Sequence, residues 1–234
     1  MMTRAEALDD GFILFARDYR DSSLILDVFS REQGRYSVVA RGARSERSKV
    51  RGRLQPFSPL TIGSMGRSEL KTATTLEFSR PAYRLVGEHL LLGLYINEVL
   101  YRLLGRFDPL QALYADYESL LAELQLKEDG VIAVRRFELA LLQELGYGIS
   151  FNYDAGTGGS IEADLSYRYV VHEGFYGTAA GEQSIKGMDL MNVANGQIEL
   201  ADSQKLKDIT RRSLAELLGE KPLKSRSLFA KVRR

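Results

Sequence analysis

Residues 23–40 read SLILDVFSREQGRYSVVA, and this stretch decides the fold of the first part of the chain. Two blocks rich in apolar and β-branched residues flank the polar segment REQGR, as expected for two strands and their connection. Gly34 stands where a tight hairpin needs a positive φ angle, which glycine adopts without a steric penalty. The stretch therefore predicts two antiparallel strands joined by a hairpin.

Three more strand-like blocks surround this hairpin. They are GFILFARDY at 11–19, SPLTIGSMG at 58–66 and LKTATTLEF at 70–78. Short strands at this spacing, separated by turn residues, are typical of a small barrel or sandwich. A five-stranded Greek-key barrel of the OB type fits the number of strands.

The spacing of apolar residues becomes helical after Pro81. Residues 89–105, 109–126 and 131–148 each carry apolar positions three or four residues apart, and the third helix is expected to end at Gly146. Loop and hairpin segments follow, then a helix expected to begin at Asp202 or Ser203. The sequence predicts an α+β protein with an OB domain at 1–80, a helical domain at 81–149, and a hairpin region with a C-terminal helix and basic tail at 150–234.

The overall charge and the residue inventory exclude several functions. The 32 Lys and Arg balance 31 Asp and Glu, so attraction to nucleic acid has to be local. The absence of cysteine excludes disulfides and thiolate chemistry, and the polar N-terminus and interrupted apolar runs argue against a membrane protein. His89 at a helix start and His172 at a strand edge are interpreted as surface residues, and no HExxH, DxD or GxSxG motif occurs. We expect a cytoplasmic, non-enzymatic protein with no catalytic residue, cofactor or metal.

Positive charge is concentrated in two segments. The first spans 35–53 and contains a single acid, Glu46; the second is the acid-free tail KPLKSRSLFAKVRR at 221–234. Aromatic residues flank the first segment, and rings that stack on bases beside arginines that follow phosphates are typical of single-strand binders. The predicted DNA-binding residues are Arg35, Tyr36, Arg41, Arg44, Arg47, Lys49, Arg51, Arg53, Phe57, Lys221, Lys224 and Arg226.

Two alternatives remain open at this point. The basic segment could instead bind RNA or an acidic protein partner. A nucleic-acid enzyme is a weaker alternative, because the sequence has no paired metal-binding carboxylates.

Four blocks of the sequence resemble the RecO family of bacterial recombination and repair mediators. They lie at 22–60, 93–104, 135–149 and 221–229, and so extend over most of the chain. The resemblance implies a non-enzymatic protein that binds single- and double-stranded DNA and anneals complementary strands. It also implies binding to the acidic C-terminal tail of the single-stranded DNA-binding protein SSB, and action with RecR to load RecA at gaps.

The resemblance also bears on metal binding and on the site for the SSB tail. In many family members the region matching NYDAGTGGS at 152–160 holds four zinc-binding cysteines; here it has none, so its fold is expected to rest on hairpin packing and aromatic residues. Those aromatic residues are Tyr153, Tyr167, Tyr169, Phe175 and Tyr176.

The acidic SSB tail would need arginine, which pairs well with carboxylates, beside leucines that could receive its apolar residue. The candidate residues are Arg135, Arg136, Leu139 and Leu142, while Phe137 and Leu141 on the same helix are interpreted as core.

Overall fold

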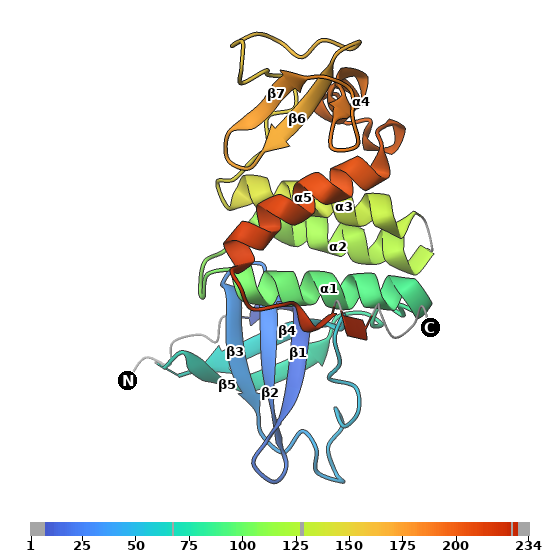
Figure 1. Cartoon of the computed structure of the whole chain (residues 1–234). Coiled ribbons are helices and arrows are strands. Elements are labelled where there is room, and N and C mark those ends of the chain that lie inside the picture. The colour runs from blue at the N-terminus through green and yellow to red at the C-terminus, as the bar shows by residue number, and fades with distance from the viewer. Residues whose placement is uncertain (1–7, 67, 127–128, 226, 229–234) are drawn as a thin grey trace. The chain divides into compact units, whose positions relative to one another are not determined.

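The computed structural model describes residues 8–66, 68–126, 129–225 and 227–228 (Figure 1). The chain forms two compact units, Met1–Lys127 with Pro222–Arg234, called unit 1, and Glu128–Lys221, called unit 2. This division differs from the predicted domains 1–80, 81–149 and 150–234. The first two helices belong to the same unit as the barrel, and the third helix belongs with the C-terminal sheet.

Unit 1 is built on a closed five-stranded barrel, as predicted. Its strands are β1 (Leu8–Tyr19), β2 (Ser23–Ser30), β3 (Gly34–Ala40), β4 (Pro59–Met65) and β5 (Leu70–Phe78), in the order β1-β2-β3-β5-β4. Only the β3–β5 pairing is parallel. Alternate apolar side chains from all five strands fill the interior, because successive residues of a strand point to opposite faces.

The hairpin between β2 and β3 depends on glycine. Gly34 has a φ of 70°, as the sequence predicts. A Cβ atom at this position would lie 2.0 Å from the carbonyl oxygen of Asp108. The turn therefore needs glycine both for its backbone conformation and for the close approach of the segment that follows the first helix.

Two helices pack against the barrel, α1 (Gly87–Leu103) and α2 (Gln111–Leu126). A buried polar link joins them to it: the Asn97 side-chain amide donates to the Leu14 carbonyl oxygen at 2.9 Å, and its oxygen accepts from the Tyr117 hydroxyl at 2.6 Å. The ring of Phe12 packs edge-on against Tyr117, with centroids 5.3 Å apart. Because both groups of the Asn97 amide are satisfied, burying this side chain carries little desolvation penalty.

The end of the described chain returns to unit 1. The backbone N–H groups of Lys224 and Ser225 each donate to the Glu98 carboxylate of α1, at 2.8 Å, and Leu223 is buried. Burial acts to raise the pKa of Glu98, but these hydrogen bonds outweigh it, so the pKa lies below its ordinary value. The carboxylate thus fixes the start of the last helical turn on α1.

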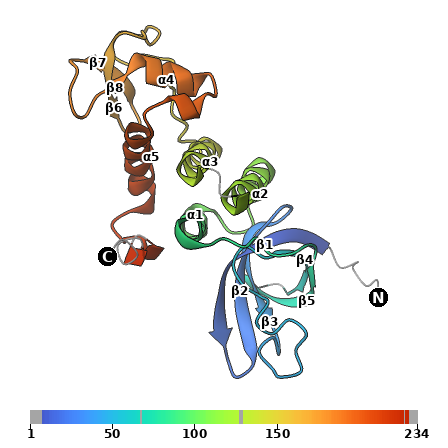
Figure 2. The same cartoon turned by 90° about the vertical axis from the view of Figure 1, so that its right-hand side faces the viewer.

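Unit 2 combines three helices, one 3₁₀ turn and a small antiparallel sheet (Figure 2). In chain order the elements are α3 (Gly130–Glu144), β6 (Ser166–Val170), β7 (Gly174–Thr178), β8 (Ile185–Lys186), α4 (Gly187–Ala194), η1 (Ile198–Leu200) and α5 (Ser203–Leu218). The third helix is followed by Gly146 at a φ of 82°, as expected. Asp202 caps α5 by accepting from the backbone N–H groups of Gln204 and Lys205, which confirms one of the two predicted caps.

The Gly-rich turn at 152–160 is held by a carboxylate. Asp154 is 5% exposed and accepts from the Gly156 N–H at 2.8 Å, while the Ala155 N–H donates to the Phe175 carbonyl oxygen at 2.7 Å. Tyr167, Tyr169 and Phe175 lie in the core of unit 2, as predicted. The remaining two aromatic residues of the predicted set, Tyr153 and Tyr176, lie outside that core.

Candidate nucleic-acid interface

Residues 41–58 connect β3 to β4, and we call them the basic loop. The backbone forms a chain of tight turns, in which Ser45 N–H donates to the Gly42 carbonyl, Ser48 N–H to Ser45, and Arg53 N–H to Val50. These bonds are 3.0, 3.1 and 3.0 Å long. The loop is therefore a folded element with its own hydrogen bonding.

Apolar side chains of the basic loop anchor it to the molecule. Ala43 and Leu54 belong to the barrel core and are 2% and 4% exposed, and Val50 packs against the same core. Phe57, 4% exposed, lies against Gly93 of α1, where an added Cβ would come within 2.9 Å of its ring. Because the apolar residues point inward, the charged residues between them point outward.

The exposed charged residues of the basic loop are five cations and one acid, Glu46. The cations are Arg41, Arg47, Lys49, Arg51 and Arg53. Within the described residues, no carboxylate lies at salt-bridge distance from Arg41, Arg47, Lys49 or Arg51. The guanidinium of Arg53 lies over the Phe78 ring, 4.0 Å from its centroid, which leaves its N–H groups at the edge free to bind an anion.

Arg44 has a structural role within the same loop. Its guanidinium pairs with Asp18 and donates to the Asp21 carbonyl oxygen at 2.7 Å, and its backbone N–H donates to the Ser22 carbonyl at 2.8 Å. These contacts tie the basic loop to the turn between β1 and β2. The turn and the part of the basic loop bonded to it lie at the end of the barrel away from α1, and the loop then runs back to α1 at Phe57 (Figure 1).

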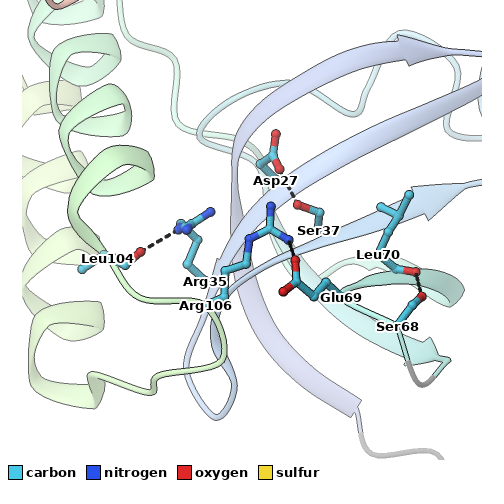
Figure 3. Close-up of polar contacts among 8 residues, drawn as sticks. All are labelled: Asp27, Arg35, Ser37, Ser68, Glu69, Leu70, Leu104 and Arg106. Atoms are coloured by element: carbon cyan, nitrogen blue, oxygen red, sulfur yellow. Dashed lines mark hydrogen bonds and ion pairs between the residues drawn. The ribbon is translucent and has the colours of Figure 1, made fainter. Parts of the chain in front are cut away.

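Arg35, predicted to bind DNA, is buried. It is 9% exposed, and its Nε donates to the Leu104 carbonyl oxygen at 3.0 Å (Figure 3). Its guanidinium lies over the Tyr101 ring, 5.2 Å from the centroid. Burial, and then the charge of Arg106, lower the pKa of Arg35, while Tyr101 and Asp27 oppose them. A cation at the last carbonyls of α1 stabilises the helix end, so this side chain holds α1 on the barrel.

Tyr36 and Phe57, predicted to stack on bases, are also interior residues. Tyr36 is fully buried and stacks on Phe107 with centroids 5.7 Å apart, and burial raises its pKa. Neither ring offers an open face in this structure. The physical reason is that all of β3 is buried: one face points into the barrel, and the other is covered.

The tail residues are placed only in part. Lys221 and Lys224 are exposed, whereas Arg226 lies outside the described residues. Lys224 lies beside α1, through the backbone bond to Glu98.

The four candidates on α3 separate into two pairs. Arg135 and Leu142 are buried, and Nη1 of Arg135 lies 2.5 Å from Oε2 of Glu138 and 2.8 Å from the Thr210 hydroxyl. Arg135 thus joins α3 to α5 and is not at the surface. The sequence placed Arg135 at the surface because it lies beside the apolar face of α3. In the structure, α5 packs over that side of α3 and covers Arg135.

Arg136 and Leu139 remain accessible on α3. Arg136 is exposed, and Leu139 lines a hollow of about 360 Å³ with Ile149, Phe151 and Val193. Residues three apart lie on one side of a helix, so a cation and an apolar hollow are neighbours here.

Neither histidine lies in a cluster that resembles a catalytic or metal site. His172, expected at a strand edge, lies in the turn between β6 and β7 at a φ of 64°. Its Nε2 is 3.1 Å from Glu216 Oε2. No group of three or more metal-ligating side chains occurs among the residues whose placement is described.

None of the described helices has the length and apolar character needed to cross a bilayer.

Sequence reasoning missed two residues beside the basic loop. Tyr19 and Arg20 end β1 and begin the turn into β2, and they line a hollow that also reaches Arg41. The only sequence signal was an aromatic residue next to an arginine at a strand end. This pair becomes part of a hollow only when the basic loop folds beside it.

The fold and the cation-rich loop define a barrel protein suited to a polyanion. Family models described as "Recombination protein O N terminal" and "Recombination protein O C terminal" match residues 2–82 and 84–227. The chain belongs to the RecO family of DNA repair and recombination proteins.

Curated relatives agree over nearly the whole length. "DNA repair protein RecO" of Aliivibrio salmonicida is 41% identical over 227 residues, covering 96% of this chain and 95% of the relative. The proteins of the same name from Vibrio parahaemolyticus (40% over 232 residues; 98% and 96% covered) and Photobacterium profundum (42% over 226 residues; 96% of each) are similarly close.

Proposed function

We propose that the basic loop is the principal DNA-binding surface of a non-enzymatic recombination mediator. The observation that carries the proposal is the set of exposed cations at 41–53, which the loop's buried apolar residues hold outward. Arg41, Arg47, Lys49 and Arg51 form the phosphate-contacting group, with Arg53 beside them. Phe57 anchors the loop to α1, whereas Arg35 holds α1 on the barrel and Tyr36 lies in the barrel core.

We propose that strand annealing uses the basic tail at 221–234 as a second surface; of its cations, the structure places Lys224 in unit 1. Two DNA strands repel each other, and a protein that neutralises phosphates on two surfaces can hold both strands. Lys224 lies beside α1, while the tip of the basic loop lies at the other end of the barrel (Figure 1). We propose that this second surface receives the second strand, or the duplex.

Recruitment is proposed to use α3. An acidic peptide with an apolar end and a free carboxylate, such as the SSB tail, fits Arg136 next to the hollow lined by Leu139. RecR is the proposed partner for loading RecA. The proposed site does not include Arg135 or Leu142, because both side chains are buried.

The loop proposal is tested by the salt dependence of oligonucleotide binding. Replacing Arg41, Arg47 and Arg51 together by alanine should lower the slope of log affinity against log salt by about 2 for single strands, at about 0.7 per phosphate contact. Affinity should fall alike for all sequences. Arg44 is left in place, because its removal would loosen the loop.

The matched control replaces three exposed cations of unit 2, Arg168, Lys186 and Arg211, by alanine. This control should keep the wild-type slope. An unchanged slope in the folded loop variant would contradict the proposal. Wild-type protein that binds RNA or an acidic protein but not DNA would instead favour the alternative partner for this loop.

The recruitment proposal is tested with Arg136→Ala. Loss of a charge-assisted pair costs about 1.5–3 kcal/mol, so affinity for an SSB-tail peptide should fall about tenfold or more. Oligonucleotide binding should be retained, and Arg168→Ala serves as the control. Full-strength peptide binding by the folded variant would show that the tail binds elsewhere.

A further inference from the structure

A hollow of about 550 Å³ lies at the base of the basic loop, in unit 1. The end of β1, the end of β3 and the start of β5 form its walls, through Tyr19, Arg20, Val39, Arg41, Leu70 and Thr72. Its size is within the range of small-molecule sites, about 300–1,000 Å³. No carboxylate is among the described residues that line it.

The chemistry of the walls is that of a nucleotide site. Tyr19 offers an aromatic ring, and Val39 and Leu70 offer apolar surface, all of which suit a base. Arg20 and Arg41 are exposed guanidinium groups, which suit phosphate because they donate two parallel hydrogen bonds.

The backbone conformation of the β1–β2 turn fixes the position of Arg20. Its φ is 50°, a left-handed conformation that a non-glycine residue adopts only where its surroundings enforce it. Its guanidinium lies over the Tyr19 ring, 5.1 Å from the centroid. The cation and the ring are therefore held together at the rim of the hollow.

The hollow is also formed in advance of binding. Arg44 fixes the β1–β2 turn to the basic loop through Ser22, Asp21 and Asp18, so two of the walls are bonded to each other. The nearby charge of Asp18 is neutralised by the same arginine. A pre-formed site avoids the entropy cost of ordering loops on binding.

From these contacts we infer that the hollow binds one unpaired nucleotide of a single strand. The base stacks against Tyr19, and the phosphates on either side bind Arg20 and Arg41. The inference rests on the proposed DNA binding and adds strand selectivity to it, because a base stacked and paired in a duplex cannot enter. OB barrels use the β1–β2 loop for oligonucleotides, which agrees with this location.

The first experiment exploits the absence of tryptophan from the chain. Tyr19→Trp introduces a single fluorescent indole, whose emission should be quenched when an oligothymidylate strand binds and its base stacks on the ring. A duplex of the same length should leave the emission unchanged. Tyr153→Trp, at an exposed position of unit 2, is the matched control and should show no quenching with either DNA.

The second experiment removes each half of the site. Tyr19→Leu keeps an apolar side chain but removes the ring, so affinity for single strands should fall about tenfold while duplex affinity and the salt slope are unchanged. Arg20→Asn keeps a residue that tolerates positive φ but removes the charge, so the single-strand salt slope should fall by about 0.7. Tyr153→Leu is the control for the ring.

The outcomes separate this inference from the proposed function. If wild-type protein binds no DNA, the proposed function fails. If wild-type protein binds single strands but Tyr19→Trp shows no quenching, or the folded Tyr19→Leu variant weakens single-strand and duplex binding equally, the nucleotide site is refuted and the basic loop stands.

Discussion

The buried ion pair between Arg135 and Glu138 predicts a large and specific loss of stability. Glu138 is fully buried, and the Arg135 side chain is 7% exposed, with 2.5 Å between Nη1 and Oε2. Removing one partner leaves the other charge buried without its ion-pair partner, which costs about 3–5 kcal/mol. Arg135→Ala also removes the hydrogen bond to Thr210 on α5. We therefore expect a loss of at least about 3 kcal/mol in the free energy of unfolding of unit 2.

A double-mutant cycle separates the charge from the packing. The cycle compares Arg135→Met, Glu138→Leu and the variant that carries both substitutions. Each single substitution should destabilise unit 2. The double substitution should recover most of that loss, because no buried charge remains. Urea unfolding followed by circular dichroism measures each variant, and Arg136→Ala on the same helix is the exposed control. Additive effects of the two substitutions, or a loss below about 1 kcal/mol for Arg135→Ala, would refute this reasoning.

Three further predictions concern unit 1 and the Gly-rich turn. Gly34→Ala should cost at least about 1–3 kcal/mol, because alanine is strained at a positive φ and its Cβ would meet the Asp108 carbonyl; an unchanged melting temperature would contradict the close approach. The pKa of Glu98 is lowered, so its stabilising effect is full above the unfolded value of 4.5 and is lost as pH falls through the folded pKa. Proteolysis of residues 222–228 should accelerate in that acid range for wild type, whereas Glu98→Gln should be cleaved faster already at neutral pH; equal rates at neutral pH would exclude the role of Glu98. Elemental analysis should find no stoichiometric zinc in the purified protein, because the turn at 152–160 has no cysteine, and one bound zinc per chain would overturn this.

The barrel could be predicted because its signals are local. Alternation of apolar residues, Gly34 in the hairpin and Asp202 at the start of α5 each act within a few residues of the chain. The same local signals indicated that positive charge gathers in the basic loop.

The burial of individual site residues could not be predicted, because it depends on distant segments. Arg35 is covered by the end of α1, and Arg135 by α5, which begins about seventy residues later. A strand pattern shows which residues share a face, but not what covers that face. Tyr19 and Arg20 were missed for the same reason, since their hollow exists only once the barrel brings the ends of β1 and β3 near the start of β5.

The return of the chain to unit 1 affects how this protein can be divided. Unit 2 is inserted between Lys127 and Pro222, so both of its ends connect to unit 1. A C-terminal truncation intended to isolate the barrel would also remove Leu223 and the two N–H groups bonded to Glu98. To remove unit 2 cleanly, residues 128–221 have to be excised and replaced by a linker that leaves 222–228 in place. A fragment that simply ends after α2 would leave the Glu98 carboxylate without these two donors, so a loss of DNA affinity in it could not be assigned to the barrel alone.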